Sequence, residues 1–299
     1  MRPIYENNVI QIEVTNGCHL SCRHCTRHVG HHRKPFFMKL EMIEQAIDSL
    51  EDFPGRVGCM GGEPALHPKF TEILDLFERK LPPERREFWT AGFRWGTYEK
   101  RIREVFPRVN YNDHILPGGR HTPMLVAIAE VVADEELRAE LISNCSFQSH
   151  WSASITPKGG FFCEVAASLD WLFDGPGGYP IEPGWWDKTP EDFQDQVAEY
   201  CRLCSGAIPM PAFSDGQGAR GGHVPDYITP LNVERLRALG SPKVLGGHYR
   251  VWTQPIDRDW VDNYKDRNLR SFRDFMAFEP EDVARQAEIW DIPYSMPSA

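Results

Sequence analysis

The chain has 299 residues, of which 41% are hydrophobic and 25% charged, the composition of an ordinary globular protein. No apolar run approaches the ~20 residues of a membrane-spanning helix, and a net charge of -10 disfavours a protein whose main partner is a nucleic-acid backbone. The first eight residues lack the apolar stretch of a secretion signal, so we expect a cytoplasmic protein without a membrane or nucleic-acid partner.

Strands and helices alternate over the first 142 residues. Strands are predicted at 9–14, 56–60, 87–91 and 108–112, and helices follow them at 38–53, 70–77, 98–106 and 123–142. Such alternation indicates parallel βαβ units. We therefore predict an α/β fold, in which residues 1–142 form a truncated, partial (β/α) barrel of the TIM type with about five or six parallel strands.

The alternation ends near residue 143. Residues 151–156 and 161–162 flank a Pro-Lys-Gly-Gly turn and predict a β-hairpin, and residues 192–203 predict a helix. We expect a small hairpin-plus-helix domain over 143–207. Residues 208–299 are irregular, and we interpret them as a C-terminal extension that serves as a substrate lid.

Three cysteines lie close together after the first predicted strand. Cys18, Cys22 and Cys25 form a C-x3-C-x2-C run, at the strand end where parallel sheets bind their ligands. Three thiolates on one short loop can ligate three irons of a cubane and leave the fourth iron open. A structural zinc site is the alternative interpretation, because thiolates at this spacing also suit zinc.

A second motif, Gly61-Gly62-Glu63-Pro64, follows the second strand. Glycines let the backbone approach a ligand amine closely, and a carboxylate complements its positive charge. Together, the two motifs resemble the radical SAM superfamily over about residues 9–112. The resemblance implies a 4Fe-4S cluster on the three cysteines, with S-adenosylmethionine bound at the open iron.

The resemblance also implies further contacts to S-adenosylmethionine. His24 takes the place of an aromatic residue beside the adenine, and Thr90 and Asn112, at the ends of the third and fourth strands, would contact the methionine carboxylate and the ribose. Nearby histidines fit a solvated loop better than a metal site: His28, His31 and His32.

Four more cysteines follow in the second domain: Cys145, Cys163, Cys201 and Cys204. Four thiolates suit a complete cubane or a tetrahedral zinc. Their order, with a hairpin after the first and a helix before the closing C-x2-C pair, resembles the twitch domain, the one-cluster relative of the SPASM domain. This resemblance implies an auxiliary 4Fe-4S cluster. The eighth cysteine, Cys59, is predicted to be a buried hydrophobe.

The resemblance implies reductive cleavage of S-adenosylmethionine to a 5'-deoxyadenosyl radical, with electrons from a low-potential donor such as flavodoxin or ferredoxin. Because an auxiliary cluster can accept a second electron, the leading prediction is an oxidoreductase that dehydrogenates an alcohol carbon of a sugar, aminocyclitol or similar small polar metabolite, as in radical SAM dehydrogenases of the butirosin-pathway type. The alternatives are an epimerase, for which Cys59 is the only spare thiol, a peptide-modifying enzyme, and a zinc-stabilised binding protein.

Several side chains are candidates for contact with the substrate. Trp185, Trp186 and Trp252 suit stacking on a sugar-like ring, and Arg220 with Gly221-Gly222 suits an anionic group, although such residues more often pack or lie in solvated loops. Oxidation of an alcohol also needs a base for the hydroxyl proton. The sequence offers three candidates without ranking them: Glu164, Arg120 and His150.

Overall fold

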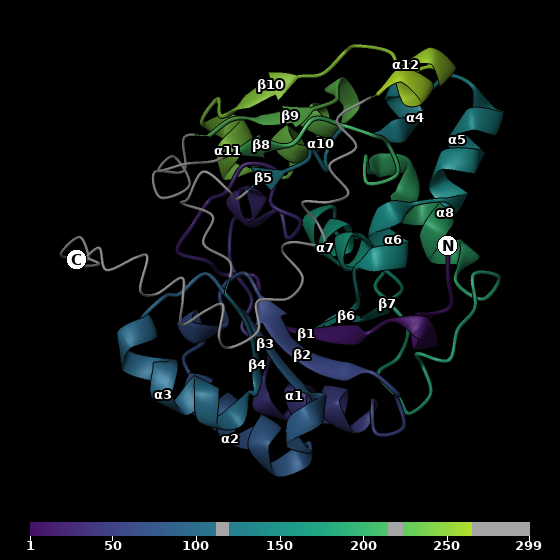
Figure 1. Cartoon of the computed structure of the whole chain (residues 1–299). Helices are drawn as coiled ribbons and strands as arrows, with labels where there is room; N and C mark the ends of the chain where they lie inside the picture. The colour runs from purple at the N-terminus through teal and green to yellow at the C-terminus, as the bar shows by residue number, and fades with distance from the viewer. Residues whose placement is uncertain (112–119, 215–223, 265–299) are drawn as a thin grey trace.

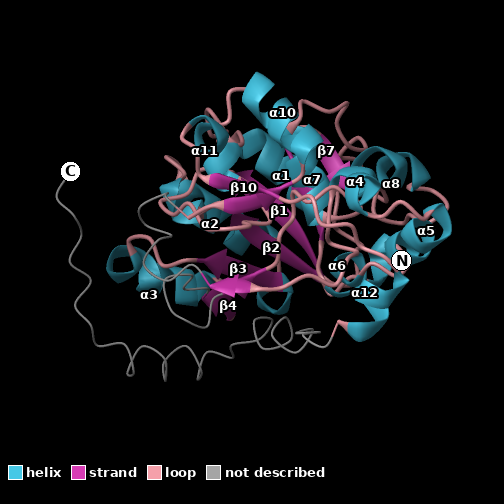
Figure 2. Cartoon of the chain, turned by 90° about the horizontal axis from the view of Figure 1, so that it is seen from above, coloured by secondary structure: helices cyan, strands magenta, loops and turns pink. Residues whose placement is uncertain are grey.

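The computed structural model describes residues 1–111, 120–214 and 224–264. Its main feature is a six-stranded sheet with the strand order β4-β3-β2-β1-β6-β7 (Figures 1 and 2). The first five of these strands run parallel, and only β7 is antiparallel to its neighbour. The sheet is open, so the predicted α/β fold with a partial barrel is confirmed.

The strands of the sheet are β1 (Val9–Thr15), β2 (Arg56–Gly61), β3 (Arg86–Thr90), β4 (Arg108–Tyr111), β6 (Ala153–Thr156) and β7 (Gly159–Phe161). The first four are followed or joined by α1 (Leu40–Asp48), α2 (Phe70–Lys80) and α3 (Trp95–Val105), which lie together on one side of the sheet (Figure 1). After the hairpin come α7 (Glu164–Leu172) and α8 (Gln194–Tyr200).

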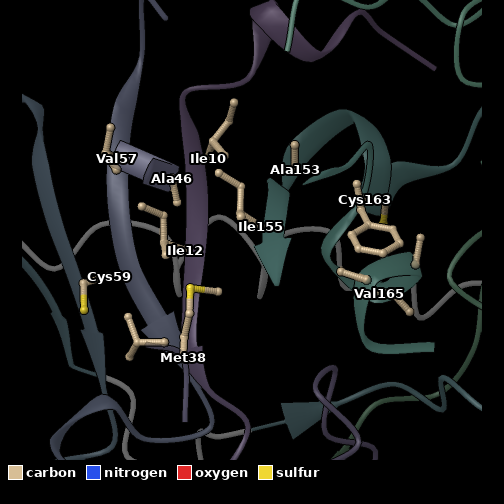
Figure 3. Close-up of a cluster of buried hydrophobic side chains, with 14 of the residues drawn as sticks. Ile10, Ile12, Met38, Ala46, Val57, Cys59, Ala153, Ile155, Cys163 and Val165 are labelled. Carbon is tan, nitrogen blue, oxygen red and sulfur yellow. The ribbon is translucent and has the colours of Figure 1, made fainter. Parts of the chain in front are cut away.

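The central strand β1 has two buried faces of opposite character. Ile10 and Ile12 point into the apolar core, near Ala46 of α1 and Val57 of β2 (Figure 3). Side chains alternate along a strand, so Glu13 points to the other face, where it is also buried. The helices therefore cover the apolar face, and the opposite face of the sheet is polar and enclosed.

The single helix predicted over 123–142 is wrong. The chain forms two short helices there, α4 (Ile128–Val131) and α5 (Glu135–Ser143). Asp134 separates them, because its carboxylate accepts the backbone N–H groups of Glu136 (2.9 Å) and Leu137 (3.1 Å) and so begins α5 as an N-cap. Helix α6 (Ser146–His150) follows, and α7, which begins directly after Cys163, was not predicted.

The hairpin predicted for 151–162 is present as β6 and β7, and it continues the main sheet. Strand β6 pairs in parallel with β1, with Ile10 opposite Ala153 and Ile12 opposite Ile155. The segment that carries the later cysteines is thus attached directly to the strand that precedes the first cysteine loop.

Residues 224–264 pack near the carboxyl ends of the barrel strands (Figure 1). They contain the parallel pair β9 (Asp226–Ile228) and β10 (Tyr249–Val251) and the helices α10 (Pro230–Ala238), α11 (Pro242–Leu245) and α12 (Arg258–Asn263). Two further short strands, β5 (Arg120–His121) and β8 (Phe213–Ser214), pair antiparallel. Within the described ranges, no helix is both long and apolar enough to cross a membrane.

Candidate active site

A cavity of about 270 Å³ lies on the polar face of the sheet, at the carboxyl end of β1. All three cysteines of the first loop line it, together with residues that end β2 and β3: Gly61, Gly62, Thr90 and Ala91. Strand order explains this meeting, because β1, β2 and β3 are neighbours and their carboxyl ends share one edge. The fold thus brings both sequence motifs to one cavity.

Two backbone hydrogen bonds join the glycine motif to the start of the cysteine loop. The N–H of Gly62 donates to the carbonyl of Thr15, and the N–H of Glu63 donates to the carbonyl of Gly17, both at 2.7 Å. A Cβ at Gly61, where φ is +157°, would lie 2.0 Å from the Thr15 oxygen, and one at Gly62 would lie 2.3 Å from the Gly17 oxygen. Glycine is therefore required for the approach of the second loop to the cysteine loop.

The Glu63 side chain is completely buried and held by several donors. Its carboxylate accepts the Thr90 hydroxyl at 2.9 Å and the N–H groups of Ala91 (2.7 Å) and Ala65 (3.2 Å). Burial raises the pKa of Glu63 to about 7, although these hydrogen bonds act in the opposite direction. Thr90, predicted as a ligand contact, both lines the cavity and orients this carboxylate, whereas Asn112 lies outside the described residues.

His24, predicted to stand beside the adenine, is buried away from the cavity lining. Its ring lies 5.3 Å from that of Phe213 and 5.8 Å from that of Tyr227. Burial lowers the pKa of His24 to about 3, with Asp226 acting in the opposite direction, so the ring is neutral at pH 7. Its backbone has a φ of +54°, in the left-handed region, which L residues other than glycine seldom adopt.

The solvated loop predicted for the next three histidines is wrong, because His28 and His31 are buried. His28 Nδ1 lies 2.7 Å from the Ser168 hydroxyl, and His31 Nε2 lies 2.8 Å from a carboxylate oxygen of Asp226. His32 Nε2 lies 3.0 Å from the carbonyl of Arg27. These rings pin the loop to α7 and to the C-terminal segment, whose contacts with residues 28–32 are invisible in the sequence.

A buried arginine in this cavity was missed by the sequence interpretation. Arg27 pairs with Glu13 of β1 (3.3 Å) and with Glu164 at the start of α7 (3.0 Å). The Ser152 and Ser154 hydroxyls donate to Glu164 and Glu13, each at 2.7 Å. The available signals were a glutamate inside a mainly apolar strand and an arginine two residues after a cysteine.

The cavity continues along the polar face towards the amino ends of the strands. Its lining there includes Arg56, Glu87, Trp89 and Arg108. The Glu87 carboxylate, which is buried, pairs with Arg56 and accepts the Trp89 indole N–H and the Asn110 amide, both at 2.8 Å. Charged and aromatic side chains therefore enclose a space that is large enough for a polar small molecule.

The four later cysteines are gathered in the core beside α6, α7 and α8. Burial raises the pKa of the Cys201 thiol, and the electrostatic influence of Cys145, Cys204 and Cys163 raises it further. The N–H of Gly206 donates to Cys204 Sγ at 3.1 Å, a type of bond that tunes the sulfurs of iron-sulfur clusters.

All eight cysteines are free thiols, and none forms a disulfide. In the described part of the chain, no three His, Cys, Asp or Glu side chains are grouped closely enough to hold one metal ion.

The remaining candidates are distributed over three places. Glu164 and His150 line the cavity, and Arg120 begins β5. Trp185 and Trp186 pack against Gly160 and Phe53 in and beside the core and are not among the residues that line the cavity, which agrees with the packing alternative rather than with a stacking role. Trp252 contacts Tyr227 edge-on. Arg220, Gly221 and Gly222 lie outside the described residues.

The position of Cys59 separates two of the predicted functions. This thiol is fully buried in the apolar core, on the helix-covered face of β2 (Figure 3). It does not line the cavity, whereas Met60 and Gly61, which follow it, do. The prediction of a buried hydrophobe is confirmed, and Cys59 has no access to a substrate beside the first cysteine loop.

Comparisons with known proteins agree with these motifs. Residues 12–111 match the model of the Radical SAM superfamily. Among solved structures, the chain is similar to BtrN in an open conformation, with 16% identity, a TM-score of 0.41 and coverage of 67% of this chain and 88% of that one. It is also similar to BtrN in complex with AdoMet and 2-DOIA, with 14% identity, a TM-score of 0.43 and coverage of 72% and 92%. No curated protein matches.

Proposed function

We propose that the protein is a radical SAM oxidoreductase that removes two electrons from an alcohol carbon of a sugar, an aminocyclitol or a similar small polar metabolite. The premise is the match of residues 12–111 to the Radical SAM superfamily model. One observation carries the proposal. The same cavity is lined by the three-cysteine loop and by residues adjoining the four-cysteine set, namely Phe147, Trp151 and Glu164.

The first cysteine loop supplies the initiating chemistry in this proposal. A 4Fe-4S cluster on Cys18, Cys22 and Cys25, with bound S-adenosylmethionine, would provide the 5'-deoxyadenosyl radical, and a flavodoxin or ferredoxin would deliver the electron. The role of the chain is to bind and orient S-adenosylmethionine and the substrate, and to exclude water from them. Gly61, Gly62 and Thr90 shape the part of the cavity nearest the loop.

The second cysteine set accounts for the second electron. Oxidation of a carbinol to a ketone requires loss of one hydrogen atom to the radical, one proton to a base and one electron to an acceptor. We assign the electron to an auxiliary 4Fe-4S cluster on Cys145, Cys163, Cys201 and Cys204. For the proton we favour Glu164 and His150, which both line the cavity.

The cavity lining supports a hydroxylated substrate. Thr26, Thr122 and Ser152 present hydroxyl groups, and Trp89 and Trp151 provide flat walls against which a ring can stack. The epimerase alternative needs a thiol that returns a hydrogen atom to the substrate, and Cys59 is buried on the other face of the sheet. Oxidation therefore accounts for more of the described site than epimerisation does.

Anaerobic incubation with candidate alcohols deuterated at the carbinol carbon tests this function. We expect deuterium in 5'-deoxyadenosine and a ketone product in equal amounts. Peptide substrates and solvent-deuterium incorporation into unoxidised product are measured in parallel, and either positive result would replace oxidation by peptide modification or epimerisation. Zinc without iron in anaerobically purified protein would contradict the radical chemistry altogether.

A further inference from the structure

Two buried, oppositely charged side chains lie behind the three-cysteine loop. Lys243 of α11 and Asp226 of β9 are each only 3% exposed, although they lie more than 200 residues from the loop. The Lys243 ammonium donates to the backbone carbonyl of Cys22 at 2.8 Å and to Asp226 Oδ2 at 3.0 Å. The ion pair thus lies within the C-terminal segment, and its lysine joins that segment to the three-cysteine loop by a hydrogen bond.

Asp226 holds the loop at two more points. Its Oδ1 accepts the backbone N–H of His24 at 2.6 Å, and its Oδ2 lies 2.8 Å from His31 Nε2. The other ring nitrogen of His31 lies 2.8 Å from the Ser241 hydroxyl. His24 has a positive φ, which costs on the order of 1 kcal/mol for a residue with a side chain. The carboxylate therefore stabilises a strained turn between Cys22 and Cys25.

Gly30 makes room for the lysine. A Cβ at this position would lie 2.6 Å from Lys243 Cε and 2.5 Å from the Ser21 hydroxyl oxygen, so any larger residue would displace the lysine chain or the loop. Gly30 is not one of the glycines with a positive φ. Its requirement is therefore space for Lys243 rather than an unusual backbone conformation.

The pair also acts on the thiols through its charges. A buried charge is stable only with a partner. Burial alone would raise the pKa of Asp226, but Lys243 and then His31 hold this pKa well below its usual range. The charges lie beside the loop itself, because the Lys243 ammonium contacts the Cys22 carbonyl and the Asp226 carboxylate contacts the His24 N–H. Net charge and hydrogen bonding near a cluster are two of the factors that set its reduction potential.

We propose that Asp226 and Lys243 are positioning residues that fix the three-cysteine loop and, through their opposite charges, balance the reduction potential of the cluster held there. The inference rests on the radical SAM domain binding its cluster at this loop. It does not depend on which substrate the enzyme oxidises.

Charge-removing substitutions in the reconstituted full-length chain test the pair, with the potential measured by EPR-monitored titration. Lys243→Met should make the cluster harder to reduce, since a positive charge is lost, and Asp226→Asn should make it easier to reduce. The double variant should return close to the wild-type potential. A purely structural pair would change iron occupancy without shifts of opposite sign.

Lys158→Met is the matched control, because this lysine pairs with the buried Asp170 away from the loop. The reduction potential of the first cluster in this variant should equal that of the wild type. Unchanged potentials in both single variants, or shifts in the same direction, would overturn the charge balance. If a variant selectively loses the cluster of the first loop, the fixing role is supported, and Lys243→Arg or Asp226→Glu should restore iron.

Gly30→Ala provides a second route if both charge variants fail to fold. It crowds Lys243 without removing a charge, so we expect weaker binding of S-adenosylmethionine, seen as a smaller ligand-induced change in the EPR spectrum. An unaltered spectrum in Gly30→Ala would contradict the contact. If the wild-type chain itself binds no iron, the premise of the proposed function has failed rather than this inference.

Discussion

The two cysteine regions differ in what surrounds the sulfurs. Cys18, Cys22 and Cys25 form a small apolar cluster with Leu20 and Ala91, apart from the main core, and all three line the cavity. The four later cysteines pack against or within the main core and do not line the cavity. We call the first region open, because its cysteines face the cavity, and the second region closed, because its cysteines do not line the cavity, although Cys145, Cys201 and Cys204 are half-buried. The proposed function requires such a difference, because only the first cluster in that proposal binds a ligand.

Removal of each cysteine set has the largest expected effect on this comparison. With Cys18, Cys22 and Cys25 replaced by alanine, we expect cleavage of S-adenosylmethionine to be abolished and iron to fall from roughly eight to about four atoms per chain. With the four later cysteines replaced, iron should fall by the same amount. Cleavage of S-adenosylmethionine should then persist while oxidation of the substrate is lost.

Cys59→Ala is the control for both sets. It removes a fully buried sulfur from the core, so we expect a loss of about 1 kcal/mol in the free energy of unfolding and no change in iron content. Equal loss of S-adenosylmethionine cleavage in both cysteine-set variants would break the distinction between an open and a closed region.

The second prediction concerns an ion pair in the closed region. Asp170 is fully buried and accepts the hydroxyl of Tyr200 and the N–H of Gly177, both at 2.8 Å, while Lys158 lies 3.0 Å away. In Asp170→Asn, the side-chain NH2 group replaces one carboxylate oxygen and faces groups that are themselves donors. We expect a loss of about 3 kcal/mol in the free energy of unfolding. Urea denaturation of the apoprotein measures it.

This variant sharpens the comparison, because its effect should be confined to stability. The potential of the first cluster should stay at the wild-type value, in contrast to Asp226→Asn. A shifted potential in Asp170→Asn would mean that the two regions are coupled and that the division drawn here is too strict.

The glycines of the open region give the third prediction. A Cβ at Gly62 would lie 2.3 Å from a backbone oxygen, so Gly62→Ala must separate the two motif loops. We expect a loss of about 2 kcal/mol in stability and at least tenfold weaker binding of S-adenosylmethionine. Gly96→Ala is the matched control, since nothing lies within 4 Å of its Cβ in α3. That change should be neutral or slightly stabilising.

The sequence was sufficient for the parts of this comparison that depend on local spacing. The βα alternation, the three-cysteine loop, the glycine motif and the hairpin after Cys145 all follow from residues near one another in the chain. Asp134 shows a local signal that was overlooked, since an aspartate before two glutamates is a common helix start.

The parts that were missed depend on contacts between distant segments. His31 is polar and occurs in a histidine-rich stretch, and only the fold places Asp226 beside it. Trp185 lies in a Gly- and Pro-rich loop, and only the fold shows that Gly160 leaves the space that its ring fills. No periodicity within one segment reports such pairings, so burial of a polar or aromatic side chain in a loop was underestimated.

The last prediction uses the carboxyl group of the open region. Burial raises the pKa of Glu63 from 4.5 to about 7. Between pH 4.5 and pH 7, the folded apoprotein therefore holds this carboxyl group protonated, whereas the unfolded chain holds it ionised. Its contribution to stability is then fully present below about pH 4.5 and is lost as the pH rises through 7. Glu63→Gln mimics the neutral acid, and we expect the melting temperature of the wild type to fall below that of the variant between pH 5 and pH 8. Glu84 is exposed, and Glu84→Gln should show no such crossing. Parallel curves of melting temperature against pH for the wild type and Glu63→Gln would mean that the hydrogen bonds from Thr90 and Ala91 outweigh burial.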